Sequence, residues 1–499
     1  MPEWLRQRAY LSPERLALIC GNDRWTFAEL DRGVSAVAGR LAASGVQAGD
    51  LVALLAGNGS RFVQLAHAVS RLGAVLVPLN VRLTADELAW QIRDAEAACL
   101  VYDEPNAANA AELKEMLPSL SCQSLSELTE RCEDGRTAGA EVARERVDLS
   151  AVHSVIYTSG TSGRPKGAML TFGNHFWSAV GSALNLGLLG DDRWLACLPL
   201  FHVGGLSILL RSVIYGSTAI VQESFDPEAV NRAIDEENVT IVSVVSTMLL
   251  RMLEARGKRS YPKSLRCVLV GGGPVPRPLL EECAQRGVPV VQTYGLTETA
   301  SQVATLAPED ALRRLGSAGR PLFTTEVRIE DDRGRALPPG EPGEIVVRGP
   351  TVTPGYLNDP EATSQVLRDG WLHTGDIGYL DADGSLYVLD RRDDLIVSGG
   401  ENVYPAEVEE VLRSHPAVLD AGVVGLADEH WGQQVAATVV PRPEVELDEE
   451  ELLAFCRSRL ASYKVPGRLR VVERLPRNAA GKLLRRALRE EWSSESRRP

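Results

Sequence analysis

The most chemically suggestive stretch of the sequence combines hydroxyl side chains, glycines and one lysine. It consists of Thr158, Ser159, Gly160, Thr161, Ser162, Gly163, Arg164, Pro165, Lys166 and Gly167. The backbone N–H groups and hydroxyls of such a loop can surround phosphate oxygens, and Lys166 adds a positive charge. The same composition also fits a solvent-exposed turn. Its spacing differs from GxxxxGK(S/T), and strand-like residues flank it on both sides, so an ordinary P-loop ATPase is disfavoured.

Lysine is rare in this chain, because only six of the 53 basic residues are lysines. Three of the six stand in suggestive places: Lys166 in the loop above, Lys464 after a predicted helix, and Lys482 near the end. A flexible ammonium suits a moving phosphate contact better than a planar guanidinium does. These three lysines are therefore candidate anion contacts, although chance could produce the same distribution.

The elements that must position these residues alternate between helical and strand-like patterns. The expected elements are a capping box at 26–29, strands at 50–55, 73–78, 239–245 and 265–270, and a charged, weakly patterned segment at 107–147. Continuous apolar strands bounded by turns are typical of buried parallel sheets. The sequence therefore predicts an α/β fold with two open sheets whose faces are covered by helices.

The pattern changes from about Gly319, where helices thin out and short strands predict a small β-barrel or mixed sheet. A charge run follows at 390–394, which by composition alone is a solvated turn more often than a hinge. Beyond it, helices at 405–414 and 448–461 and strands at 418–424, 434–440 and 468–473 predict a compact α+β unit. We expect an N-terminal domain at 1–390 and a C-terminal domain at 395–499.

Composition limits the function classes. The 499 residues are 44% hydrophobic and 24% charged, which predicts several globular folding units. The net charge of −14 disfavours a general role on nucleic acid. Eight cysteines without a CxxC pair indicate a reducing compartment. The N-terminus lacks a signal pattern, and the uncharged run 167–190 holds five glycines and polar residues, so we expect no membrane insertion and a cytoplasmic protein.

Six spaced motifs together resemble the acyl-adenylate-forming superfamily of acyl-CoA ligases, luciferases and peptide-synthetase adenylation domains. They lie in the family's order at 158–167, 294–299, 343–356, 374–376, 391–400 and 481–482, so the resemblance covers nearly the whole chain. It implies two stacked α/β sheets plus a small β-barrel, followed by a small mobile α+β domain. It also implies an ATP-dependent ligase that converts a carboxylic acid into acyl-AMP and pyrophosphate, and then transfers the acyl group to CoA.

The resemblance also implies a role for each motif residue. Glu298 would bind the Mg²⁺ that bridges ATP phosphates, Tyr294 would stack on adenine, and Asp376 would accept the ribose hydroxyls. Without the resemblance these three would be a surface carboxylate, a core tyrosine and a turn aspartate. The other implied ATP contacts are Thr158, Ser159, Gly160, Thr161, Ser162, Gly163, Lys166, Gly272, Gly273, Gly295, Thr299 and Arg391. The implied CoA contacts are Gly399, Gly400 and Trp431.

Two further roles concern catalysis and movement. Lys482 would reach the carboxylate and the α-phosphate during adenylation, when negative charge grows on the phosphorus oxygens. Residues 391–394 would form a hinge centred on Asp393, about which the C-terminal domain rotates. His202 would line the acyl pocket, although a lone histidine in an apolar stretch is more often a core residue.

The acid is indicated by four stretches, at 171–176, 182–187, 192–194 and 212–216, that most resemble o-succinylbenzoate CoA ligases of menaquinone synthesis. That acid is a dicarboxylate, so Arg211, inside an apolar helix-like run, is a candidate anchor for the second carboxylate. The other interpretation of Arg211 is an ion pair with an internal acid.

Three alternatives stay open. They are another aryl or medium-chain acyl-CoA ligase, a stand-alone adenylation enzyme that loads a carrier protein, and a non-catalytic nucleotide sensor. The presence of Lys482 argues against the sensor. The expected partners are small molecules, with a homo-oligomer left open.

Overall fold

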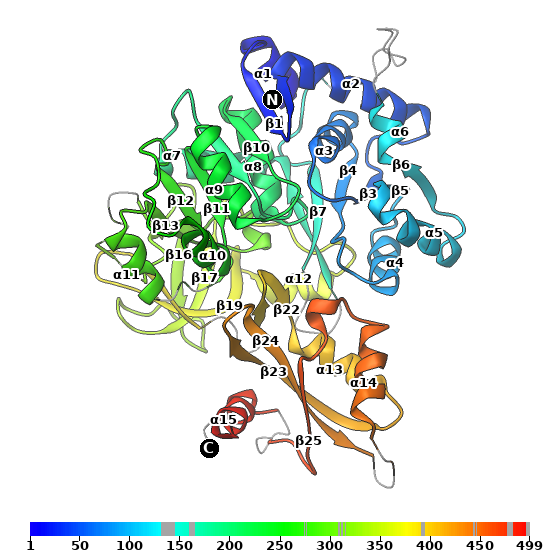
Figure 1. The fold of residues 1–499 in the computed structure, drawn as a ribbon, viewed down its shortest axis with the longest axis vertical. Coiled ribbons are helices and arrows are strands. Elements are labelled where there is room, and N and C mark those ends of the chain that lie inside the picture. The colour runs from blue at the N-terminus through cyan, green and yellow to red at the C-terminus, as the bar shows by residue number, and fades with distance from the viewer. Residues whose placement is uncertain are drawn as a thin grey trace. The chain divides into compact units, whose positions relative to one another are not determined.

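Largely buried strands and amphipathic helices make up the part of the chain described by the computed structural model (Figure 1). It comprises residues 1–130, 145–158, 165–273, 275, 277–307, 310, 313–314, 316–390, 395–442, 445, 447–476 and 483–495. Two compact units can be separated in it. Unit 1 is Met1–Val81, Ile92–Ile156 and Gly167–Leu389, and unit 2 is Arg82–Gln91, Tyr157–Lys166 and Asp390–Pro499.

The first sheet has six strands in the order β6-β5-β3-β4-β7-β8. Their bounds are β3 Leu51–Leu55, β4 Val75–Pro78, β5 Cys99–Tyr102, β6 Ser121–Ser124, β7 Val152–Thr158 and β8 Lys166–Thr171. The pairs from β6 to β7 are parallel. Every residue of β4 is buried, as expected of a strand covered on both faces.

The second sheet has nine strands in the order β15-β14-β13-β12-β11-β9-β10-β1-β2. Their bounds are β1 Leu16–Cys20, β2 Asp23–Thr26, β9 Arg193–Ala196, β10 Thr218–Val221, β11 Ile241–Val244, β12 Cys267–Val270, β13 Val290–Tyr294, β14 Ala304–Thr305 and β15 Arg320–Pro321. The six central strands pair in parallel, whereas β2, β14 and β15 are antiparallel edge strands.

Helices fill the space between these two sheets. One apolar cluster joins residues of both sheets with α2 (Phe27–Ala43), α3 (Ser60–Leu72) and α8 (Val203–Tyr215) (Figure 1). The other helices before residue 300 are α1 Trp4–Leu11, α4 Ala85–Asp94, η1 Glu104–Asn106, α5 Ala107–Met116, α6 Leu125–Thr129, α7 Phe172–Leu186, α9 Pro227–Glu236, α10 Ser246–Arg256, α11 Arg277–Gln285 and η2 Thr297–Thr299. The stacked α/β architecture is thereby confirmed.

The third sheet is antiparallel, five-stranded and curled into a half-barrel. Its strands are β16 Glu326–Glu330, β17 Gly343–Arg348, β18 Leu367–Arg368, β19 Trp371–Leu380 and β20 Leu386–Asp390, with α12 at Pro360–Val366. It has its own apolar core, which includes Tyr294 from the end of β13.

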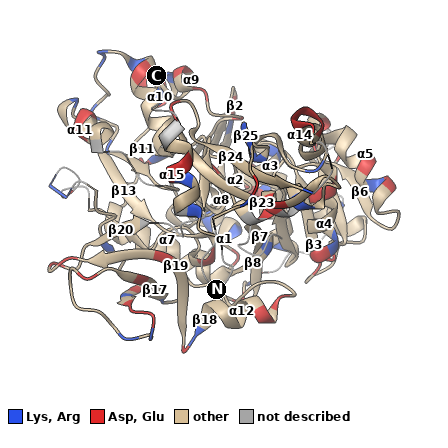
Figure 2. Ribbon diagram, turned by 90° about the horizontal axis from the view of Figure 1, so that it is seen from below, with Lys and Arg blue, Asp and Glu red and all other residues tan. Residues whose placement is uncertain are grey.

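The C-terminal part of unit 2 contains a sheet in the order β22-β21-β24-β23, with β25 parallel to β24. Its elements are β21 Ile396–Ser398, β22 Glu401–Val403, α13 Pro405–Ser414, β23 Val418–Asp428, β24 Gly432–Pro441, α14 Glu449–Arg457, η4 Ser462–Lys464, β25 Arg468–Val471 and α15 Arg485–Glu495. The first turn of α14 carries three glutamates, red in Figure 2, which suit the positive end of the helix dipole.

The sequence patterns located most of these elements and missed some. The segment at 107–147, expected to be weakly patterned, contains α5, β6 and α6, and α5 has little apolar periodicity to reveal it. The run at 167–190 forms β8 and the buried helix α7. None of the helices in the described ranges combines the length and hydropathy needed to cross a bilayer.

A buried ion cluster joins the first three helices. Arg71 in α3 is 1% exposed and donates to Glu3 (2.9 Å) and Asp31 (2.5 Å). Glu3 is 4% exposed and also caps α1 by accepting from two backbone N–H groups. Removing the guanidinium would therefore leave a carboxylate buried without its cation.

We predict that Arg71→Met lowers the free energy of unfolding by about 3 to 5 kcal/mol, since one partner of a buried ion pair is removed. Denaturant titration measures the change. Arg61→Met is the control, because Arg61 and Glu104 form a 3.5 Å pair in which both side chains are more than half exposed. Equal losses in the two variants would contradict the prediction.

Three buried histidines predict acid sensitivity. Burial lowers the pKa of His67 to about 4, with Arg71 adding to the effect, and that of His153 to about 3. Burial also holds the pKa of His175 well below its ordinary value, and its ring centroid lies 4.8 Å from that of His153. Each histidine is neutral in the folded state, so its stabilising contribution is complete above pH 6.5 and is lost as pH falls toward the folded pKa.

We expect the free energy of unfolding to fall as pH drops from 6.5 toward 4. His153→Phe keeps an aromatic ring at this position and removes one proton-binding group. It should reduce the slope of unfolding free energy against pH by about 1.4 kcal/mol per pH unit. An unchanged slope would show that His153 does not take up a proton on unfolding.

Candidate active site

The parallel strands of the nine-stranded sheet deliver several motif residues to one edge. The strands β9, β11, β12 and β13 pair in parallel, so their carboxyl ends lie on the same side. After these ends come the turn to His202, the glycines 271–273, and the segment from Tyr294 to Glu298. Ligands of open α/β sheets bind outside such carboxyl ends. The predicted residues His202, Gly272, Gly273 and Tyr294 to Glu298 therefore follow strand ends at one edge of this sheet.

The predicted magnesium ligand Glu298 lies in η2, directly after β13. Its Oε1 accepts a hydrogen bond from the Tyr356 hydroxyl at 2.8 Å, and its backbone carbonyl accepts from the N–H of Thr353 at 2.8 Å. Tyr356 in turn forms a bridge with Ala168 in β8, just after the glycine-rich loop. Residues far apart in sequence thus hold one carboxylate, and Tyr356 links it to β8.

This carboxylate fits a magnesium ion that ATP phosphates and water largely surround, because Mg²⁺ in phosphate sites needs only one or two protein carboxylates. Among the described residues, no cluster of three or more His, Cys, Asp or Glu could form a metal cage. Glu298 remains the candidate ligand.

Tyr294 and Asp376, both predicted to contact the nucleoside, meet directly. The Tyr294 hydroxyl donates to Asp376 Oδ2 at 2.7 Å, and the two residues are 4% and 5% exposed. The Asp376 N–H donates to Thr374 Oγ1 at 3.1 Å. The hydrogen bond orients the carboxylate and brings together the phenol ring and the carboxylate that are predicted to contact the nucleoside.

The neighbouring backbone is tightly packed at Gly295 but open at Gly273. A Cβ at Gly295 would lie 1.5 Å from the carbonyl oxygen of Ser301, so only glycine fits there. Gly272 has a φ of +78°, which favours glycine, and a Cβ at Gly273 would meet nothing within 4 Å. The Thr299 hydroxyl exchanges hydrogen bonds with the N–H and carbonyl of Leu296, both at 3.0 Å, and so braces η2.

The two ends of the phosphate loop approach each other, because the Thr158 hydroxyl donates to the carbonyl of Lys166 at 3.4 Å. The remaining predicted loop contacts lie outside the described residues. Those are Ser159, Gly160, Thr161, Ser162 and Gly163. Arg391, Asp393 and Lys482 lie outside them as well, so their roles stay predictions.

The predicted acyl-site residues lie on α8. His202 is the N-cap residue of this helix, is partly exposed, and has its ring against Phe201 at 4.7 Å between centroids. Arg211 lies more than two turns further along and is only 2% exposed. Its guanidinium donates to Ser178 Oγ at 3.1 Å and lies 5.4 Å from the Trp194 ring centroid.

Arg211 has no acidic partner in the part of the chain that the structure describes. No described carboxylate lies within 4.0 Å of it, and its Nε has no described hydrogen-bond partner. Burial lowers the pKa of Arg211 below its ordinary value. An ion pair with a described internal acid, which the sequence left open, is therefore absent.

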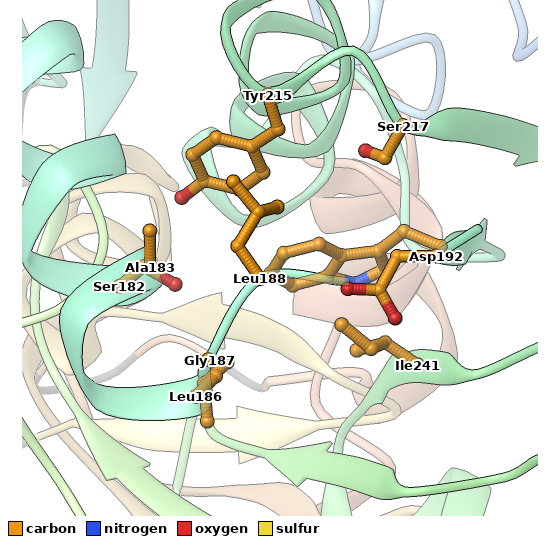
Figure 3. Close-up of a pocket in the computed structure, with 10 residues that line it drawn as sticks. Ser182, Ala183, Leu186, Gly187, Leu188, Asp192, Tyr215, Ser217 and Ile241 are labelled. Atoms are coloured by element: carbon orange, nitrogen blue, oxygen red, sulfur yellow. The ribbon is translucent and has the colours of Figure 1, made fainter. Parts of the chain in front are cut away.

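A small pocket lies beside this region (Figure 3). Its lining includes Ser182, Leu188, Asp192 and Tyr215. The Asp192 carboxylate accepts hydrogen bonds from Arg266, Thr240 and the N–H of Leu189, at 2.6 to 2.9 Å. The Tyr215 hydroxyl donates to the carbonyl of Ala179 at 2.5 Å. These groups are used in internal bonds, so the pocket offers little charge to an acid.

The three predicted CoA contacts lie together in unit 2. Gly399 and Gly400 form the turn between β21 and β22, with φ of +58° and +85°. The Gly399 N–H donates to the carbonyl of Trp431 at 2.8 Å, and a Cβ at Gly399 would meet the Trp431 ring at 2.8 Å. Trp431 is 48% exposed. A glycine turn beside an exposed indole is suited to an extended, partly apolar ligand.

Two contributors were not assigned from the sequence. Tyr356 was included in a motif without a role, although it holds Glu298. Ser178 lies on the buried face of α7 and contacts Arg211. A serine among apolar helical residues is too common a pattern to single out.

The chain matches known protein families along most of its length. Residues 5–357 match the model of the AMP-binding enzyme family, and residues 407–482 match the AMP-binding enzyme C-terminal domain. The 2-succinylbenzoate–CoA ligase of Geobacillus kaustophilus is 54% identical over 98% of this chain and 97% of its own length. That of Bacillus mycoides is 51% identical over 98% of both chains.

Solved structures give the same result. A double mutant of o-succinylbenzoate CoA synthetase from Bacillus subtilis, bound with its product analogue OSB-NCoA, is 46% identical, with a TM-score of 0.92 over 98% of both chains. The same synthetase in complex with the acyl-adenylate intermediate OSB-AMP has a TM-score of 0.75 at 46% identity over 98% of both chains. The resemblance inferred from the six motifs is confirmed, and the chain belongs to the AMP-binding enzyme family.

Proposed function

We propose that this protein is an AMP-forming acid–thiol ligase that converts 2-succinylbenzoate, ATP and CoA into 2-succinylbenzoyl-CoA, AMP and pyrophosphate. The observation that carries the proposal is the 54% identity, along nearly the whole chain, to a 2-succinylbenzoate–CoA ligase. The product belongs to menaquinone biosynthesis. Seven described cysteines are free thiols, which suits the cytoplasm.

The first step activates the acid. One carboxylate oxygen attacks the α-phosphorus of ATP, a new P–O bond forms, and pyrophosphate leaves with the electrons of the broken bond. Magnesium bound with ATP would neutralise charge on the phosphates. Glu298, fixed by Tyr356, would hold that ion, while Tyr294 and Asp376 would hold the nucleoside. Lys482 would stabilise the charge that grows on phosphorus oxygens in the transition state.

The second step transfers the acyl group. The CoA sulfur attacks the acyl carbon of the adenylate, and AMP leaves as the C–O bond breaks. Gly399, Gly400 and Trp431 would lie along the pantetheine. We infer that residues 395–499 rotate about a hinge at 391–394, so that Lys482 acts in the first step and the glycine turn acts in the second.

Arg211 provides the physical basis for a dicarboxylic substrate. A fully buried guanidinium is costly unless an anion compensates it, and its described neighbours include Ser178, Tyr215 and the Trp194 ring but no carboxylate. Arg211 lies on α8, the helix that His202 begins at the predicted acyl site. A second carboxylate of the substrate would satisfy the guanidinium while the first is activated.

We predict that the protein prefers 2-succinylbenzoate over two monocarboxylate analogues, 3-benzoylpropionate and 2-butyrylbenzoate, each of which lacks one carboxylate. The analogue that lacks the held carboxylate should lose on the order of 10²-fold in kcat/KM, because it leaves Arg211 unpaired. Arg211→Met should remove most of this difference and leave the KM for ATP unchanged.

Steady-state CoA-thioester formation measures these constants. If the parent protein prefers a monocarboxylate, including benzoate or a medium-chain fatty acid, another acyl-CoA ligase is the better assignment. Transfer to a phosphopantetheine on a carrier protein in preference to CoA would favour the carrier-loading alternative. If only the Arg211→Met result fails, Arg211 is not the anchor and the substrate stands.

We also predict that Lys482→Ala slows adenylation by about 10² to 10³-fold, the usual effect of losing a group that stabilises transition-state charge. Thioester formation from supplied 2-succinylbenzoyl-AMP should continue near the parent rate. Pyrophosphate release without CoA measures the first step, and a single turnover of the adenylate with CoA measures the second. Equal slowing of both steps would remove Lys482 from this role.

A further inference from the structure

Lys464, one of the three lysines singled out as possible phosphate contacts, is buried and already paired with carboxylates. It is 2% exposed. Its Nζ lies 2.7 Å from Glu87 Oε1 and 2.7 Å from Glu407 Oε1, and all three side chains are at most 10% exposed. Burial lowers the pKa of Lys464, but Glu407, Tyr463 and Glu87 together raise it above its ordinary value. In this arrangement Lys464 is therefore not a phosphate contact.

Glu87 joins two parts of unit 2. It closes the capping box of α4, where its Oε2 accepts from the N–H of Thr84 at 2.8 Å and from the Thr84 hydroxyl at 2.9 Å. The same oxygen accepts from the N–H of Ala461 at 3.1 Å, and Oε1 accepts from Lys464. One side chain thus starts a helix in segment 82–91 and fastens it to η4, more than 370 residues later.

A second ion pair lies on the same segment. Arg82 donates to Glu401 Oε1 at 2.8 Å, and the Glu401 side chain is 3% exposed. Glu401 directly follows the Gly399–Gly400 turn that was assigned to CoA. Segment 82–91 therefore contacts Glu401, the residue that follows the glycine turn, through Arg82, and contacts η4 through Glu87.

Lys464, Glu87 and Glu407 form a cluster of three charged side chains with one cation. Glu87 and Glu407 are two nearly buried carboxylates, and Lys464 is the ammonium that bridges them. Lys464 and Glu407 both belong to the continuous C-terminal segment, whereas Glu87 belongs to segment 82–91, whose ends continue as Val81 and Ile92 of unit 1. The ion pair with Glu407 is therefore internal to the C-terminal segment, whereas the ion pair with Glu87 joins that segment to residues 82–91.

We propose that the Lys464–Glu87 pair is a latch that fixes segment 82–91 beside the Gly399–Gly400 turn and so positions that turn for thioester formation. Lys464 and Glu87 are then positioning residues for the second step. The inference rests on the proposed two-step function. The Lys464–Glu87 pair would form for thioester formation, the step that uses the Gly399–Gly400 turn. It would open for adenylation, the step that uses Lys482.

Glu87→Gln is the sharp test, because glutamine also serves in a capping box and leaves Lys464 paired with Glu407. We expect it to slow thioester formation from supplied 2-succinylbenzoyl-AMP by about 10²-fold, as for a small misplacement of reacting groups. Adenylation, measured as pyrophosphate release without CoA, should stay near the parent rate. Lys464→Met should act in the same direction, and the double variant should be no slower than the slower single variant.

The matched control is Glu29→Gln. Glu29 closes the capping box of α2, where its Oε2 accepts from the N–H and hydroxyl of Thr26 at 2.8 and 2.9 Å. It should leave both steps near the parent rate. Equal slowing of adenylation and thioester formation by Glu87→Gln, or additive effects in the double variant, would overturn the latch.

Hydrogen exchange separates this inference from the proposed function. Peptides covering 82–91 should exchange faster in Glu87→Gln and Lys464→Met than in the parent protein and in Glu29→Gln, whichever acid is the substrate. Unchanged exchange would overturn the latch. A parent protein that forms no thioester from 2-succinylbenzoate would overturn the proposed substrate, and the exchange result would still decide the latch.

Discussion

Parallel pairing of β9, β11, β12 and β13 is the constraint on which the unit 1 site depends. In a parallel sheet every strand ends at the same edge, so chemistry-bearing turns from distant parts of the sequence are brought together without a dedicated contact between them. Final positions are then set locally. Gly295 lets the backbone approach Ser301, and Tyr356 and Tyr294 each fix one carboxylate. The sheet supplies proximity, and short hydrogen bonds supply orientation.

Buried charge is treated in three different ways in this protein. Arg71 forms ion pairs with two carboxylates, Glu3 and Asp31, so its charge is neutralised by the protein itself. Lys464 also has two, but one of them comes from a separate segment, so its neutralisation depends on conformation. Arg211 has a hydroxyl and an aromatic ring and no described acid. Since an uncompensated buried charge is costly, Arg211 is the buried cation that indicates an anionic ligand.

Local signals made much of the fold predictable. The Thr26–Glu29 capping box, the apolar strands at 50–55 and 265–270, and the helix at 405–414 depend on neighbouring residues, and the structure contains them. Elements without such signals were missed. The strands of the β21–β22 hairpin have only three residues each. Helix α15 extends to Glu495, and its Trp492 is buried, with the indole N–H donating to Thr438 Oγ1 at 3.1 Å. That contact joins residues too distant in sequence for any local pattern to reveal.

The two capping boxes show why a site is harder to predict than a fold. Thr26–Glu29 and Thr84–Glu87 have the same residue types at the same spacing, and their hydrogen bonds differ little in length. Each begins a helix, which is all that four residues can specify. Only Glu87 also accepts from Ala461 and Lys464, because the fold brings η4 to it. A local motif therefore determines which side chains start a helix, whereas the tertiary structure determines which of those side chains also make contacts with distant residues.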